Sequence, residues 1–112
     1  MDEQQKAAIY RFHAEFCKCL ADASRLMIIT QLEGGEVSVG ELSQLLGLPQ
    51  ASVSKHLAIL REHGLVTGRR QGASIYYSLS DPRVCEAISL LKQVQADQAD
   101  RRRELALRGA DL

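Results

Sequence analysis

Hydrophobic residues recur at steps of three and four in five separate stretches of the chain, and this periodicity predicts amphipathic helices. In the first stretch the stripe contains Ile9, Phe12 and Phe16. Gly34 and Gly64 are expected to end the second and fourth helices, because glycine readily adopts the left-handed conformation found there. The expected helices cover residues 3–20, 22–33, 38–46, 50–63 and 81–107.

The pattern changes after residue 64, where two segments have the β-branched and aromatic composition of strands. Residues 65–67 and 74–79 are expected to pair as a hairpin, with 69–73 at its tip. The fold class is therefore mostly α (α+β), with the order ααααββα. Two short helices joined by a tight turn make a helix-turn-helix over 38–63, and the hairpin over 65–79 adds a wing.

Length and composition are those of one folded domain. The chain has 112 residues, of which 46% are hydrophobic, so a packed core is expected rather than disorder. No apolar run approaches the roughly 18 residues that a membrane span needs. The first residues, MDEQQKAA, are acidic and polar, unlike a secretory signal. We therefore expect a single cytoplasmic domain over residues 1–112, with no membrane partner.

Positive charge is concentrated near the predicted wing, although the whole chain is neutral. Lys and Arg number 14, as do Asp and Glu, and this balance alone argues against nucleic-acid binding. Residues 50–76, however, carry four basic side chains and one acidic side chain, a local net charge of +3. The four basic residues are Lys55, Arg61, Arg69 and Arg70.

The predicted helix over 50–63 has a surface suited to duplex DNA. Short or hydrogen-bonding side chains occupy its outward face, and the N–H groups at a helix N-terminus favour phosphate. Gln can pair with adenine and Lys with guanine, while Arg at a wing reaches flanking phosphate or the minor groove. A solvated polar face beside a basic turn would show the same residues. The expected DNA-binding residues are Gln50, Ala51, Ser52, Ser54, Lys55, His56, Arg69, Arg70 and Gln71.

Three segments of the chain resemble the ArsR/SmtB family of bacterial winged-helix repressors. They read LADASRLMIITQL, VGELSQLLGLPQASVSKHLAILREHGLV and RRQGASIYYSL, and the resemblance covers about residues 12–95. It implies a homodimer joined through the first and last helices, 3–20 and 81–107. It also implies binding to double-stranded DNA at an inverted-repeat operator, with release by an inducer. The residues from Gln50 to His56 match the family's recognition helix, and those from Arg69 to Ala73 match its wing.

Two metal sites familiar in this family have no counterpart in the sequence. One places two cysteines in a Glu-Leu-Cys-Val-Cys-Asp-Leu stretch, where this chain has Ser38 and Gly40. The other begins Asp-x-His on the last helix and needs a second histidine. Here Arg83 follows two residues after Asp81, and no histidine occurs after His63. We therefore expect that DNA binding requires no cofactor and that an inducer acts elsewhere.

The remaining candidates for an inducer site are the thiols of Cys17, Cys19 and Cys85. Cys17 and Cys19 point about 200° apart on one helix, so they are not expected to chelate one ion together. The family's dimer brings the first and last helices together, so either could pair with Cys85 of the same or the partner subunit. Such thiols suit As(III), a soft divalent metal, or oxidation to a disulfide or persulfide bridge. His13, four residues before Cys17 on the same helix face, would either lower the pKa of that thiol or add a ligand. Equally, cysteine often packs as a small hydrophobe, most readily Cys19.

An enzyme is not expected, because the sequence shows no Gly-rich phosphate loop and no nucleophile motif. Ser52 and His56 are four residues apart, but no orienting acid accompanies them in the sequence. Two alternatives to a thiol-responsive repressor remain open. One is a winged-helix module that binds protein without sensing, and the other is a repressor that is independent of thiols. The operator, the regulated genes and the class of inducer also remain open.

Overall fold

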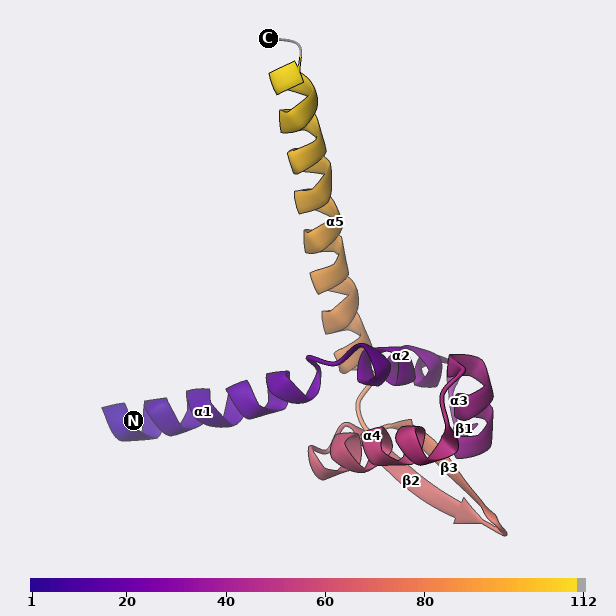
Figure 1. Cartoon of the computed structure of the whole chain (residues 1–112). Helices are drawn as coiled ribbons and strands as arrows, with labels where there is room; N and C mark the ends of the chain where they lie inside the picture. Colours follow the sequence, from indigo (N-terminus) through magenta and orange to yellow (C-terminus); the bar gives the residue numbers. More distant parts are fainter. Residues whose placement is uncertain (111–112) are drawn as a thin grey trace. The chain divides into compact units, whose positions relative to one another are not determined.

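The protein folds as two compact units in a computed structural model that describes residues 1–110. The first unit is Met1–Asp81 and the second is Pro82–Leu112. The second unit contains the last of the two helices to which the resemblance assigns dimerisation, and the first unit contains the other. The first contains every other helix and strand (Figure 1).

The helices of the first unit begin where the sequence supplies side-chain caps. Asp2, Asp22 and Ser38 each accept a hydrogen bond from a backbone N–H in the first turn of the helix that follows, as good N-cap residues do. Gly47 ends the third helix with φ of 65°, a conformation that glycine adopts without strain. The helices are α1 (Glu3–Cys19), α2 (Ala23–Gln31), the short 3₁₀ helix η1 (Leu32–Gly34), α3 (Val39–Leu46) and α4 (Gln50–Glu62).

Three antiparallel strands form one small sheet in the order β1-β3-β2. These strands are β1 (Val37–Ser38), β2 (Val66–Gln71) and β3 (Ser74–Leu79). The sequence did not predict β1. It also placed residues 69–71 at the hairpin tip, whereas they belong to β2, paired with residues 74–76 of β3. The tip is therefore only Gly72 and Ala73, and Gly72 has φ of 63°.

The core lies where α2, α3 and α4 pack together with the sheet. Ile28 and Ile29 of α2, Leu42 of α3 and Leu57 of α4 are completely buried. Because these residues follow helical spacing, the opposite faces of the same helices stay exposed. The exposed face of α4 is the one expected to bind DNA.

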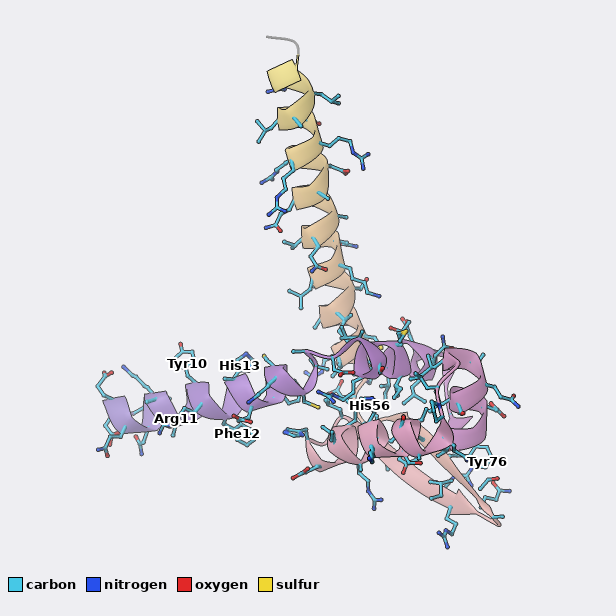
Figure 2. All side chains as sticks on the ribbon, viewed as in Figure 1. Tyr10, Arg11, Phe12, His13, His56 and Tyr76 are labelled. Atoms are coloured by element: carbon cyan, nitrogen blue, oxygen red, sulfur yellow. The ribbon has the colours of Figure 1, made fainter. Side chains whose placement is uncertain are left out.

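α1 contributes little to this core. Cys19, in its last turn, is its only buried residue, whereas Ile9 and Phe12 are 51% and 80% exposed. Figure 2 shows the side chain of Phe12 pointing outward from α1. The predicted stripe therefore exists, but it is uncovered in the single chain.

The second unit is one long helix, α5 (Arg83–Ala110), of 28 residues. It begins two residues later and extends three residues further than the sequence predicted. Exposed apolar side chains recur along it, namely those of Leu90, Leu91, Val94, Leu105 and Leu107. Within residues 1–110, none of the helices combines the length and the apolar character needed to cross a lipid bilayer.

Candidate nucleic-acid interface

The N-terminal end of α4 has the properties of a recognition helix. Its N-cap is Pro49, which supplies no side-chain hydrogen bond to the first turn, and no acidic residue lies in that turn. Its leading N–H groups and the positive end of its dipole thus remain available to an anion. Four of the predicted contacts are exposed on it: Gln50, Ala51, Ser54 and Lys55. Ser52 is half-buried beside them.

A hollow of about 240 Å³ separates this end of α4 from the start of α3 and the tip of the hairpin. Gln50 and Ser54 line it from α4, Ser38 from the start of α3 and Ser74 from the hairpin. Amides and hydroxyls of this kind serve as hydrogen-bond partners of DNA phosphates and sugars. Sequence reasoning included Gln50 and Ser54 but missed Ser38 and Ser74, because only the folded sheet brings the three elements together.

His56 corrects one expectation about the exposed face. Its side chain is 22% exposed and points toward α2 (Figure 2). Its Nδ1 lies 3.4 Å from Nη1 of Arg25 and 3.9 Å from Oδ1 of Asp22. An acid therefore does stand beside this histidine, which the sequence separation of 34 residues concealed. His56 packs against the scaffold and does not extend from the same surface as Gln50.

Arg69 corrects a second expectation, because it is held by a carboxylate. Its Nη2 and Nε donate to Glu36 at 2.8 and 3.2 Å, and its guanidinium lies 5.3 Å from the ring centroid of Tyr76. The hydrogen bond lowers the pKa of Glu36 and raises that of Arg69. Arg69 also donates to Gln71 at 2.8 Å. Two of the three predicted wing contacts are therefore already engaged within the protein.

Arg70 has the opposite orientation, because side chains alternate across a strand. It pairs with Ile75 in the ladder and is exposed, whereas Arg69 pairs with Tyr76. A hairpin register with a two-residue turn at Gly72 and Ala73 would have predicted from the sequence that Arg69 lies opposite Tyr76. Glu36 had no such signal, because its position depends on the unpredicted strand β1.

Comparison with known proteins gives the same architecture. A family model described as a helix-turn-helix domain matches residues 20–69. The transcriptional regulator NmtR of Mycobacterium tuberculosis is 42% identical over 88 residues, which cover 79% of this chain and 70% of NmtR. The transcriptional activator HlyU of Vibrio cholerae is 43% identical over 83 residues, which cover 72% and 77% respectively.

Solved structures agree. The homodimeric winged helix-turn-helix DNA-binding domain Mb0332 of Mycobacterium bovis, a possible ArsR-family regulator, matches with a TM-score of 0.77 and 29% identity, over 89% of this chain and 93% of that one. The chain belongs to the ArsR/SmtB family. It is thus a DNA-binding transcriptional regulator with a winged helix-turn-helix, and not an enzyme, as the sequence predicted.

The thiols of this ArsR/SmtB regulator occupy three different environments. Cys17 is exposed, with Sγ 3.5 Å from Nε2 of His13. Cys19 is 4% exposed, and burial raises the pKa of its thiol, opposed by the nearby charge of Arg25. Cys85 is half-buried on α5, in the second unit. Within residues 1–110, no cluster of three or more His, Cys, Asp or Glu side chains could hold a metal ion. The pairing of Cys17 or Cys19 with Cys85 stays a prediction.

Proposed function

We propose that this regulator is a homodimeric repressor that inserts the N-terminal turns of α4 into the major groove at each half of an inverted-repeat operator. The observation that carries the proposal is the exposed first turn of α4, which has no side-chain cap and no acidic residue. Gln50 and Lys55 are exposed there and suited to base edges. Ser54 and the hydroxyls around the neighbouring hollow suit the flanking phosphates.

The wing would contribute one free cation per subunit. Arg70 is exposed on β2, close in sequence to the hairpin tip, where a side chain can reach phosphate beside the major groove. Arg69 is held by Glu36, so it is a secondary contact at most.

The dimer would cover the apolar side chains that the single chain leaves exposed. Ile9 and Phe12 of α1, together with Leu90 and Leu91 of α5, are each more than half exposed. Monomeric proteins rarely leave such apolar stripes open. Mb0332, whose fold this chain shares, is homodimeric, which supports the same state here. A two-fold dimer would present two copies of α4 to a palindromic site.

Release would follow modification of the cysteines. Cys17 is the thiol best placed to react, because it is exposed and has an imidazole at 3.5 Å. We propose that it captures arsenite or a soft divalent cation, or is oxidised, and that Cys85 is its partner thiol. In the oxidative case, a peroxide takes two electrons and two protons from the thiols and leaves a disulfide and water. Burial of Cys19 fits the packing role considered for it from the sequence.

A footprint on the promoter next to the gene tests DNA binding, with titrations at several salt concentrations. A regulator that binds phosphates must lose affinity steeply as salt increases. The same footprint is then repeated after addition of arsenite, cadmium, peroxide or polysulfide. Protection lost with one reagent and kept with the others identifies the inducer class. An affinity for DNA that does not change with salt concentration would contradict the proposed interface. A footprint that persists with every reagent would contradict the thiol sensor alone.

A further inference from the structure

Arg25 stands at the junction of three helices. It belongs to the first turn of α2, and its side chain is 15% exposed. Its Nε donates to the backbone carbonyl of Cys19 at 2.6 Å, and its Nη1 lies 3.4 Å from Nδ1 of His56. One guanidinium therefore touches the end of α1 and the recognition helix α4 at the same time.

The contact with α1 is made at the only place where α1 is buried. The carbonyls in the last turn of a helix lack intrahelical partners, and Arg25 supplies a charged donor to one of them. A shallow pocket of about 170 Å³ opens beside this point, bordered by residues of α1, Arg25 and the end of α4. Packing between α1 and the end of α4 therefore leaves a gap here, with Arg25 at its edge.

The contact with α4 is made on the inward side of the recognition helix, beside the completely buried Leu57 and Leu60. His56 is on the inward side of α4, whereas Ser54 and Lys55 are exposed. Nδ1 of His56 accepts a hydrogen bond from Arg25 when the imidazole is neutral. Asp22, the N-cap of α2, lies 4.0 Å from Nη1 of Arg25 and keeps the guanidinium oriented. The exposed face is therefore held in register by a bond on the opposite side of the helix.

We propose that Arg25 is a positioning residue for DNA binding, which ties the orientation of α4 to the last turn of α1. This inference rests on the proposed function, in which α4 binds DNA and α1 carries the reactive thiol Cys17. A shift of α1 moves the Cys19 carbonyl and, through its hydrogen bond, the guanidinium of Arg25. The hydrogen bond between Arg25 and His56 is then strengthened or broken. The planar fork of arginine can serve both partners, whereas the single ammonium of lysine cannot.

Arg25→Gln and Arg25→Lys test the proposal, with Arg61→Gln as the matched control. Arg61 is an exposed arginine in the last turn of α4, so its removal costs the same charge without touching the bridge. Hydrogen–deuterium exchange of the DNA-free protein should be roughly tenfold faster at the amides of 53–56 in both Arg25 variants. The control should exchange like the unaltered protein. Unchanged exchange in both Arg25 variants would overturn the proposal.

DNA affinity supplies the second measurement. The Kd for the operator should rise roughly tenfold in Arg25→Gln, and His56→Gln combined with it should add little, because the two residues act as a unit. Strictly additive effects would overturn the positioning role. Thermal unfolding identifies a variant that has lost its fold, and in that case Arg25→Lys decides. If the unaltered protein fails to bind duplex DNA, the proposed function falls, while the exchange experiment still decides the role of Arg25.

Discussion

The guanidinium of Arg69 and the carboxylate of Glu36 form a bidentate ion pair, in which Nη2 of Arg69 lies 2.8 Å from Oε2 of Glu36. Both side chains are about half exposed, at 52% and 42%, so the pair can open toward an incoming phosphate. In the proposed complex Glu36 would compete with DNA for Arg69, and its carboxylate places a negative charge beside the wing.

The two wing arginines should differ in their effect on DNA binding. Arg70→Ala should weaken binding to every duplex, because it removes a phosphate contact, and should flatten the slope of log K against log salt by about 0.9. Arg69→Ala should change both much less, because the charge of Arg69 is already paired with Glu36 and no unpaired cation is lost. Anisotropy titrations from low to high salt measure this. Equal slopes for Arg70→Ala and the unaltered protein would remove the wing from the interface.

Glu36→Gln should increase affinity for duplex DNA. The substitution removes a negative charge near the phosphates and releases Arg69 from a charged partner. The gain should be largest at low salt and shrink as salt increases, because the pair is exposed to screening. Comparison with Glu41→Gln, an exposed acid on α3, separates this local effect from a general change in net charge. A weaker complex with Glu36→Gln would show that Arg69 must stay anchored to function.

Asp22 should matter for stability in a pH-dependent way. It caps α2 through the N–H of Arg25 at 3.1 Å, and that hydrogen bond lowers the pKa of Asp22 below its usual 3.8. A carboxyl with a depressed pKa stabilises the fold above its unfolded-state pKa and loses that contribution as pH falls through the folded-state value. Asp22→Ala should cost about 1 kcal/mol at neutral pH. Urea unfolding at pH 7 and pH 3 should show a smaller difference between the two proteins at acid pH.

Cys17→Ser should leave DNA binding intact and abolish release by the inducer. The side chain is exposed on α1, so serine fits without strain. Cys85→Ser should have the same effect if the two thiols act together. Thiol counting before and after inducer treatment accompanies the footprint. Full release in both variants by arsenite and by oxidants would remove these thiols from the sensor.

Phe12→Asp should disrupt the dimer. Phe12 is 80% exposed in the single chain, so a charge there does not disturb the core of the subunit, yet it would be buried in the proposed interface. Sedimentation should show a shift from dimer to monomer, and operator affinity should fall because two half-sites are no longer bound together. Gln5→Asp, at an exposed position near the start of α1, is the control. A Phe12→Asp dimer of unchanged stability would place the interface elsewhere.

Local signals made most of the fold predictable. The caps Asp22 and Ser38 and the stop at Gly47 placed three helix ends within about a residue, because these ends are fixed by neighbouring side chains. The strand β1 was missed because two residues carry no periodicity, and its pairing with Tyr76 and Tyr77 is a distant contact.

The candidate site was predictable in its location but not in its partners. Helical spacing correctly predicted that Gln50 and Lys55 are exposed, because the spacing of the apolar residues in a helix shows which face is buried and which face is exposed. It could not show that His56 turns toward Arg25 or that Glu36 lies against Arg69. Those contacts join residues 31 and 33 positions apart, and only the tertiary fold determines which charges meet.

Ser38 belongs to two elements at once. It is paired with Tyr76 across the sheet, and its hydroxyl accepts the N–H of Glu41 to begin α3. Ser38 therefore links the hairpin directly to the start of the helix-turn-helix, and this link helps to hold the two in a fixed relative position. We expect the spacing between the DNA contacts of α4 and those of the wing to be fixed. Operators can therefore differ in base sequence, but the distance between the bases read by α4 and the backbone contacted by the wing must stay constant.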